Sequence, residues 1–294
     1  MNYYLAATAL RTFSATNWTK AIYRWIGNRK TERQLSAERA GWVLEKLNQV
    51  PTTEPERFLE LGTGWMHAYS LYPALTRDAE IHAFDVWDNR SFAAFQNAVT
   101  QLPDHVARLD LTDDQRAAAE RKIAALGSAA DFDQAYQTLN LHYAYAHDGR
   151  LPYPENHFDA IYSVDVLEHV VASGFDTVAE DWFRVLKPGG RLLAQVGLDD
   201  HLAHYDRSKS RKHYLRHSKG LFANWLENDV QYINRIPATD MMDRLKRVGF
   251  QVLEAERLLV DDPENLPVHQ DYRDQPAEDI ATYRLNLVIE KPRG

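Results

Sequence analysis

Short apolar runs recur along the middle of the chain, each with the length of a buried strand. They lie at 57–62, 81–85, 141–146, 158–164 and 191–196, and glycine, proline or polar residues bound most of them. Helix-sized segments separate the runs. This strand, helix, strand rhythm predicts a parallel sheet with right-handed crossovers.

Two more strands are predicted near the C-terminus. A helix capped by Thr239 or Asp240 precedes runs at 250–257 and 283–290. The last run alternates apolar side chains with mainly polar ones, which is typical of an antiparallel strand near a sheet edge. Over 57–294 we therefore expect a doubly wound α/β domain, with a mostly parallel seven-stranded sheet and one antiparallel strand.

Helical patterns extend and interrupt this domain. Residues 1–56 carry apolar stripes at helical spacing, with Ser36 as a candidate N-cap, and are interpreted as a helical cap; a substrate lid or a homodimer contact is the alternative. Residues 90–141 are too many for a bare loop. The capping-box pair Thr112 and Gln115 predicts a helical insertion there.

Composition and charge narrow the class of protein. The 294 residues include 45% hydrophobic and 26% charged side chains, as in an ordinary globular protein. A net charge of −8 disfavours a general nucleic-acid binder. The absence of cysteine excludes disulfides, thiolate zinc sites and cysteine nucleophiles. No signal-peptide pattern or membrane-length apolar stretch is visible, so we expect a cytoplasmic protein without a membrane partner.

The first predicted strand runs into glycines at its carboxyl end, where open α/β sheets bind ligands. Glu60 directly precedes the bend Gly62-Thr63-Gly64, and glycines let a backbone approach a ligand closely. Asp85 ends the next strand, 21 residues after Gly64. An acid at that position is placed to accept both hydroxyls of a ribose.

Nicotinamide cofactors share these features, so an NAD(P)-dependent oxidoreductase is a remote alternative. The dinucleotide fingerprint has a third glycine where this chain has His67, and a histidine resists close packing of helix on strand. Glu60 would repel a pyrophosphate but would suit a cationic amino acid. These two residues favour a ligand that carries a ribose, an ammonium and a sulfonium.

Five motifs follow one another at consistent spacing. They are Glu60-Leu61-Gly62-Thr63-Gly64, Asp85, the stretch 151–159, Asp165-Val166-Leu167-Glu168-His169-Val170, and the stretch 184–193 around Lys187-Pro188-Gly189-Gly190. The series resembles class I S-adenosylmethionine-dependent methyltransferases, especially the small-molecule type related to ubiquinone- and menaquinone-pathway enzymes. It covers roughly 57–197.

The resemblance implies S-adenosylmethionine as cofactor and S-adenosylhomocysteine as product. Glu60 would hold the methionine ammonium, directly or through water, and Asp85 the ribose hydroxyls. Asp148 would meet the adenine amino group, with His147 as the alternative because the segment is one residue short. The full set of implied cofactor residues is Glu60, Gly62, Thr63, Gly64, Asp85, Val86, Trp87, His147, Asp148, Ser163 and Asp165.

Two candidate catalytic residues follow the fourth strand. Methyl transfer from a sulfonium depends largely on positioning, and a base is needed only where the acceptor must lose a proton of high pKa. Glu168 and His169 lie at the start of 166–186, a segment predicted to be mostly helical. His169 is a hypothetical general base; a role in capping or packing the helix start is the alternative.

The same residues raise a metal hypothesis beside the main expectation of a metal-free site. Asp165, Glu168 and His169 form a D-x-x-E-H cluster that could hold a divalent cation with His201 or His204 as a further ligand. The resemblance adds that some relatives use an E-x-x-E-H arrangement in this way.

The polar, aromatic stretch 198–238 is the candidate for acceptor recognition, because it follows the fifth strand and should lie over the carboxyl edge of the sheet. Its candidate residues are His201, His204, Tyr205, Arg211 and Tyr214. A basic run at 207–219 predicts an anionic acceptor, since arginine forks match carboxylate and phosphate; a solvated loop face is the alternative.

The expected function is methyl transfer to a small-molecule acceptor, with oxygen as the preferred atom. No feature of the sequence fixes that atom, so nitrogen and carbon acceptors remain open. A non-catalytic protein that keeps the cofactor site is the second rival, and the intact series of motifs argues against it.

Overall fold

The computed structural model describes residues 2–14, 35–229 and 232–294. Residues 15–34 of the predicted N-terminal cap, with the helical stripe expected there, lie outside the described residues.

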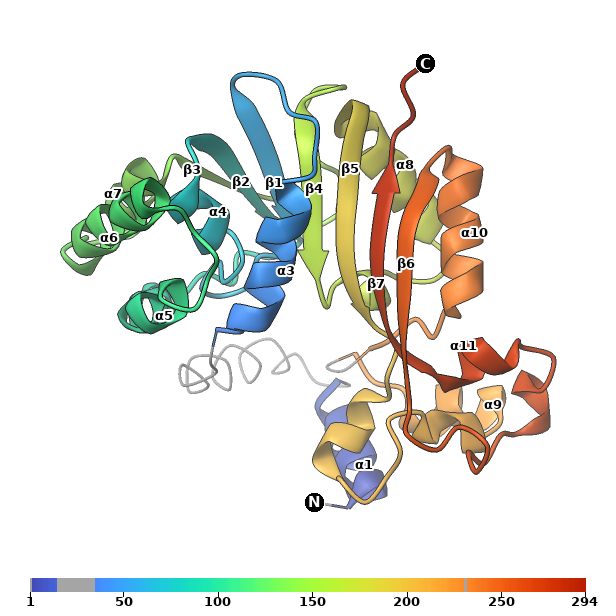
Figure 1. Cartoon of the computed structure of the whole chain (residues 1–294). Coiled ribbons are helices and arrows are strands. Elements are labelled where there is room, and N and C mark those ends of the chain that lie inside the picture. The colour runs from blue at the N-terminus through green and yellow to red at the C-terminus, as the bar shows by residue number, and fades with distance from the viewer. Residues whose placement is uncertain (1, 15–34, 230–231) are drawn as a thin grey trace.

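A single seven-stranded sheet in the order β3-β2-β1-β4-β5-β7-β6 forms the centre of the protein (Figure 1). Strands β1 to β5 pair in parallel, and β7 runs antiparallel to both β5 and β6. This confirms the predicted sheet. The strands are β1 (Glu56–Leu61), β2 (Ala79–Asp85), β3 (Leu141–Tyr145), β4 (Phe158–Val164), β5 (Leu186–Gly197), β6 (Gln251–Leu259) and β7 (Thr282–Glu290).

Helices cover both faces of the sheet. One apolar core joins the sheet to α3, α4 and α5, with α6 and α7 packed outside them; a second core joins the other face to α8 and α10. These helices are α3 (Ala37–Leu47), α4 (Leu71–Thr76), α5 (Phe92–Val106), α6 (Asp113–Gly127), α7 (Phe132–Leu139), α8 (Phe175–Val185) and α10 (Ala238–Val248). The layers place the carboxyl ends of β1 to β5 on one common edge.

Local capping signals in the sequence are partly confirmed. Ser36 caps α3, and Thr112 with Gln115 forms the expected capping box of α6. The predicted cap of α10 is wrong, because the N-cap is Pro237 and both Thr239 and Asp240 lie inside the helix. Asp279, distant in the sequence, accepts the Thr239 backbone N–H at 3.1 Å and so replaces a local cap.

The predicted helix over 166–186 is wrong in its first part. Only Leu167–His169 forms one 3₁₀ turn, and α8 begins at Phe175. The Asn234 side chain donates to the carbonyls of Leu167 and Val170, at 2.8 and 3.0 Å. It thereby satisfies acceptors that a continuing helix would use itself.

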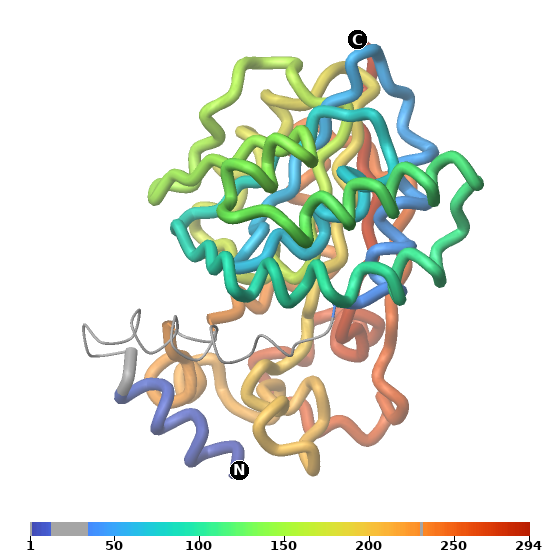
Figure 2. The backbone as a smooth tube through the Cα atoms, turned by 90° about the vertical axis from the view of Figure 1, so that its left-hand side faces the viewer, coloured from blue at the N-terminus to red at the C-terminus, as the bar shows by residue number. Residues whose placement is uncertain are grey.

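A small lobe, here called the cap lobe, lies below the carboxyl edge of the sheet (Figures 1 and 2). It combines α1 (Tyr3–Ser14), the stretch 198–237 with α9 (Lys219–Leu221), and the stretch 260–281 with α11 (Ala277–Ala281). Its apolar core consists of Tyr3, Ala7, Leu202, Tyr214, Leu215, Phe222, Leu226 and Tyr272. In the described part of the chain, no helix is long and apolar enough to cross a membrane.

One buried hydrogen bond ties α1 to the cap lobe. The Tyr3 hydroxyl donates to Asp200 Oδ2 at 2.7 Å, and the Tyr3 side chain is fully buried. We predict that Tyr3→Phe lowers the free energy of unfolding by about 1–3 kcal/mol, because it leaves a buried carboxylate without this donor. Denaturant titration measures the change. Tyr4→Phe is the matched control, since Tyr4 is exposed; equal stability of the two variants would contradict the prediction.

Candidate functional site

The loop after β1 has the backbone that a ligand cradle requires. Gly62 and Gly64 both adopt left-handed conformations, with φ of +68° and +65°. A Cβ on Gly62 would lie 2.3 Å from Val166, so this loop packs directly against the end of β4. No atom of the described residues lies within 4 Å of the corresponding position on Gly64, so that backbone is approachable within the described part of the chain.

Glu60 is buried beneath this loop and holds it in shape. Its Oε2 accepts hydrogen bonds from the Thr63 hydroxyl at 2.9 Å, from the Ser70 backbone N–H at 2.9 Å and from the Ser70 hydroxyl. Burial raises the pKa of Glu60 to about 7. The loop therefore folds around a carboxyl group whose charge a cationic ligand above it would stabilise.

His67 occupies the position of the missing third glycine by adopting a left-handed backbone, with φ of +53°. Its Nδ1 lies 2.8 Å from the Thr63 hydroxyl, and its Nε2 lies 2.7 Å from the Tyr136 hydroxyl on α7. While Glu60 is ionised, Thr63 donates its only proton to that carboxylate, so His67 Nδ1–H must donate to Thr63. His67 Nε2 then accepts from Tyr136, which links the helical insertion to the loop.

Asp85 lies at the end of β2, where the sequence predicted a ribose site. Its Oδ2 accepts the Gly64 N–H at 2.9 Å, and its Oδ1 accepts the Val86 N–H at 2.8 Å. Burial raises the pKa of Asp85 above its usual range. These contacts bring the two acidic residues predicted around the glycine loop to the same edge of the sheet.

The candidate adenine residues lie beside Asp85 and form an accessible surface. Val86 and Trp87 are more than a third exposed. The His147 ring lies against Trp87, with centroids 4.6 Å apart, and its Nδ1 is 2.9 Å from the Val86 carbonyl. Asp148 instead accepts the Arg150 N–H in an exposed turn.

Ser163 and Asp165 occupy the end of β4 opposite the loop. Ser163 is fully buried, whereas the Asp165 side chain is 37% exposed. Asp165 has a left-handed backbone, with φ of +54°. Its side chain accepts a hydrogen bond from Arg39 on α3, and its Oδ1 lies 3.6 Å from Arg284 Nη2. These two arginines were missed from the sequence, because 126 and 119 positions separate them from Asp165.

Glu168, His169 and His201 converge at the carboxyl ends of β4 and β5. One potential ligand atom from each lies within 4.8 Å of those of the other two. His169 Nδ1 donates to the Tyr232 carbonyl at 2.6 Å, because a carbonyl only accepts, so the Nε2 lone pair is free in the neutral ring. Desolvation by the surrounding residues lowers the pKa of both imidazoles, that of His201 to about 4, although His169 itself is exposed. We call these three residues the edge cluster.

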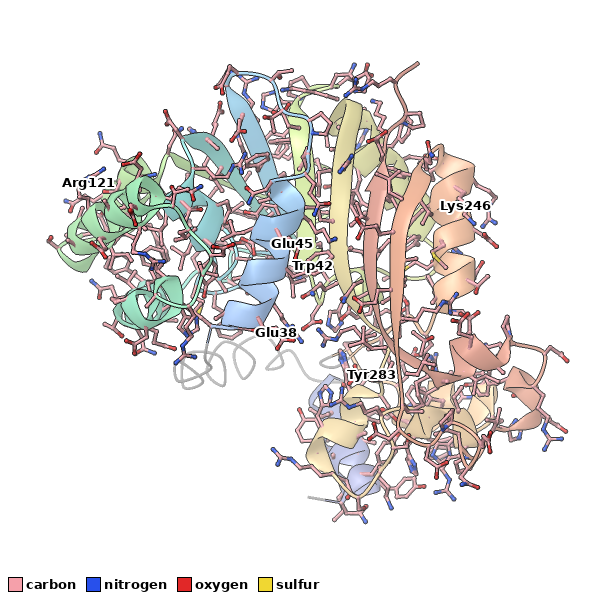
Figure 3. The ribbon with its side chains drawn as sticks, viewed as in Figure 1. Glu38, Trp42, Glu45, Arg121, Lys246 and Tyr283 are labelled. Carbon is pink, nitrogen blue, oxygen red and sulfur yellow. The ribbon has the colours of Figure 1, made fainter. Side chains whose placement is uncertain are left out.

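The other predicted acceptor residues are spread over the cap lobe. His204 Nε2 donates to Asp199 Oδ2 at 2.8 Å, and Tyr205 follows it on the same turn. The Arg211 guanidinium lies over the ring of Tyr283. Figure 3 shows Tyr283 at the junction of the sheet and the cap lobe. Tyr214 lines a small pocket with Glu168, Asn234 and Arg235. The last two residues were also missed, since neither belongs to a motif.

The residues present fit S-adenosylmethionine. The glycine loop is approachable at Gly64, a buried carboxylate at 60 lies beneath it, and Asp85 with the accessible Trp87 extends the site along the edge. A ligand with an ammonium, a ribose and an aromatic base matches these groups in that order.

The contact between His67 and Tyr136 yields a test of the site's architecture. We predict that Tyr136→Phe lowers the free energy of unfolding by about 1–3 kcal/mol, because a buried ring nitrogen loses its donor. Denaturant titration measures the effect, and Tyr145→Phe, at an exposed tyrosine on the neighbouring β3, is the control. A Tyr136 variant as stable as the control would show that the chain of hydrogen bonds is absent.

Comparison with known proteins agrees with this site. A family model for a methyltransferase domain matches residues 90–194. The chain is 46% identical over 54 residues to the ubiquinone/menaquinone biosynthesis C-methyltransferase UbiE of Vibrio cholerae, which is 18% of this chain and 20% of that protein. It is 34% identical over 101 residues to the protein of the same name from Psychromonas ingrahamii, covering 34% and 36% of the two chains. The chain thus matches a fifth to a third of these relatives' length.

A solved structure shares the whole architecture. Burkholderia thailandensis 1,6-didemethyltoxoflavin-N1-methyltransferase, with bound 1,6-didemethyltoxoflavin and S-adenosylhomocysteine, is 12% identical with a TM-score of 0.50. The match covers 93% of this chain and 86% of that one, and at this identity it shows the fold alone. The match to a methyltransferase domain covers residues 90–194, and the ordered motifs and the strand order resemble those of class I, Rossmann-like S-adenosylmethionine-dependent methyltransferases.

Proposed function

We propose that the protein transfers the methyl group of S-adenosylmethionine to an oxygen atom of a small-molecule acceptor. The observation that carries this proposal is the common edge of the sheet. The carboxylates of Glu60 and Asp85 bracket the glycine loop on one side, and the edge cluster lies at the ends of β4 and β5 on the other. A cofactor held by the first group can present its sulfonium toward the second.

The cofactor side works through charge and shape. Glu60 would stabilise the methionine ammonium above the loop, and Asp85 would accept the ribose hydroxyls. Trp87 and His147 would flank the adenine. Gly62, Thr63 and Gly64 would lie under the methionine and ribose, with Ser163 and Asp165 facing them.

The acceptor side must take one proton. During transfer the bond between sulfur and the methyl carbon breaks, its electron pair stays on sulfur, and the acceptor oxygen forms the new bond to carbon. The hydroxyl proton leaves into the edge cluster, where the His169 ring is neutral and its Nε2 lone pair is available. Positioning of the two reactants supplies the greater part of the rate, because the sulfonium is already an activated leaving group.

An anionic acceptor suits the pocket between the sheet and the cap lobe. Arg235 lines this pocket with Glu168, and its Nη1 is buried without a hydrogen-bond partner in the described part of the chain. Its Nη2 is paired with Glu227 and its guanidinium lies over Phe222, which fixes its orientation. A carboxylate or phosphate on the acceptor would satisfy the remaining nitrogen. The recognition residues would be His201, His204, Tyr205, Arg211, Tyr214 and Arg235.

Carbon is the second candidate for the methylated atom. The relatives from Vibrio cholerae and Psychromonas ingrahamii are named as C-methyltransferases. An acceptor carbon also loses a proton during methylation, so the edge cluster suits both atoms.

Turnover with a metabolite mixture tests the proposal. We expect the protein to form S-adenosylhomocysteine from S-adenosylmethionine labelled with ¹³C in the methyl group, and the carbon shift of the product distinguishes O- from C-methylation. His169→Ala should lower kcat by about 10²–10⁴-fold with unchanged cofactor affinity. His142→Ala, at an exposed histidine of β3, is the control. Cofactor binding without turnover in any mixture would support a binding protein instead, and binding of NADH in its place would support an oxidoreductase.

The pKa of Glu60 predicts the pH dependence of cofactor binding. Because this pKa is raised to about 7, the group is largely protonated at pH 6, and a cationic ligand must displace that proton. Affinity for S-adenosylmethionine should therefore rise by up to about tenfold per pH unit below pH ~7 and level off above it. Isothermal titration calorimetry from pH ~6 to ~8.5 measures this.

The matched variant is Glu60→Gln, which keeps an oxygen acceptor for Thr63 and Ser70 but removes the titration. The cofactor's own amino group titrates against both proteins alike, so the difference between the two curves reports Glu60. Parallel curves for the two proteins would contradict a role for its charge.

A further inference from the structure

Three carboxylates converge around Gly197 at the carboxyl end of β5. A Cβ added to Gly197 would lie 2.7 Å from Glu168 Oε1, 3.4 Å from Asp199 Oδ1 and 3.6 Å from Asp165 Oδ1. Like charges this close repel one another unless a cation or a proton compensates them. The structure supplies such compensation for two of the three.

Asp165 and Asp199 have basic partners. Arg39 donates to Asp165, with Arg284 nearby, and His204 lies 2.8 Å from Asp199 Oδ2. Asp165, which the sequence placed in a possible metal cluster, is therefore already engaged by cationic side chains.

Glu168 has no such partner. It is 1% exposed, and its Oε1 accepts the Gly197 N–H at 3.1 Å. Its Oε2 is buried without a hydrogen bond, and no lysine or arginine of the described ranges pairs with it. A buried carboxylate oxygen without a partner is costly as an anion, so its surroundings favour either a proton or a bound cation.

The two histidines of the edge cluster are oriented as metal-binding histidines usually are. His169 donates Nδ1–H to the Tyr232 carbonyl, which fixes the ring and directs the Nε2 lone pair outward. A hydrogen bond from the non-ligating nitrogen to a carbonyl is the usual outer contact of a metal-bound histidine. The ring centroid of His201 lies 5.1 Å from that of His169, so the second imidazole lies beside the first.

We propose that Glu168, His169 and His201 bind a first-row divalent transition metal. The protein would supply two imidazoles and one carboxylate as ligands. This donor set suits Mn²⁺, Fe²⁺, Co²⁺ or Zn²⁺ better than Mg²⁺ or Ca²⁺, which prefer oxygen ligands. Of the ligands in the sequence hypothesis, Glu168, His169 and His201 are kept, and Asp165 is left out. This inference rests on the proposed function, because the metal would act on the acceptor molecule that is methylated.

A cation at this position would bind the acceptor hydroxyl at an open coordination position. It would lower the pKa of that hydroxyl, so that the proton would leave to solvent while the acceptor oxygen forms its bond to the methyl carbon. The sulfur would keep the electron pair of the broken bond. With the cation bound, the metal would promote the deprotonation that the proposed function otherwise assigns to His169.

A second group of potential ligands, Glu80, His82 and His157, serves as an internal control. Its ligand atoms also lie within 4.8 Å of one another, but it lies at the opposite end of the strands from the edge cluster. Arg57 already pairs with Glu80 at 2.9 Å there.

The test is titration of chelator-treated protein with Co²⁺, followed by visible absorption and calorimetry, and methylation assays before and after chelation. We expect one Co²⁺ per chain, with binding lost in Glu168→Gln and in His201→Gln and retained in His157→Ala. Unchanged S-adenosylmethionine affinity in each variant shows that the fold is intact. Chelation should abolish turnover, and added metal should restore it.

Two results would overturn the metal proposal. One is Co²⁺ binding that persists in the Glu168 and His201 variants or is lost only in His157→Ala. The other is turnover that survives thorough chelation, which would leave the proposed methyl transfer standing with His169 as the proton acceptor. Failure of methyl transfer with and without metal would instead reject the proposed function, while the Co²⁺ titration still reports on the site.

Discussion

The buried carboxyl group of Glu60 is the constraint on which the cofactor side of this protein depends. The turn from β1 to α4 folds around it, because Thr63 and Ser70 both direct their hydroxyl groups to the same oxygen. His67 extends this network to Tyr136 on α7. The group therefore holds the loop in shape, and burial raises its pKa because desolvation disfavours the charged carboxylate.

The two sides of the site are assembled over very different sequence distances. The proposed cofactor side comes mainly from β1, β2 and the loops that follow them, and residues at the ends of β3 and β4 complete it. The acceptor side combines the end of β5 with the cap lobe, and α1 joins that lobe through Tyr3 and Asp200. Arg39 reaches Asp165 from α3. Substitutions in α1 or α3 can thus alter acceptor binding without touching a motif.

The sheet was predictable from the sequence, because each buried strand leaves an apolar run and each crossover leaves a helix-sized gap. The glycine bend and Asp85 were predictable for the same reason, since strand ends fix their place. The residues around 166–174 were not, because Asn234 takes up the carbonyls that would continue the helix. The cap of α10 failed likewise, since Asp279 supplies it from another part of the chain.

The acceptor side was predictable only in part. The motif places Glu168 and His169 after β4, and the stretch 198–238 was expected over the same edge, but no spacing in the sequence shows that His201 meets them. Arg39 and Arg235 carry no local signal, because their roles depend on contacts between distant segments. Long-range assembly of this kind is visible only in three dimensions.

A crystal structure of the protein with S-adenosylhomocysteine would show whether the glycine loop and the edge cluster face one ligand. We expect the ribose on Asp85, the amino group above the loop over Glu60, and the sulfur facing Glu168, His169 and His201. A sulfur atom turned away from these residues, or a ligand that avoids the glycine loop, would contradict this arrangement.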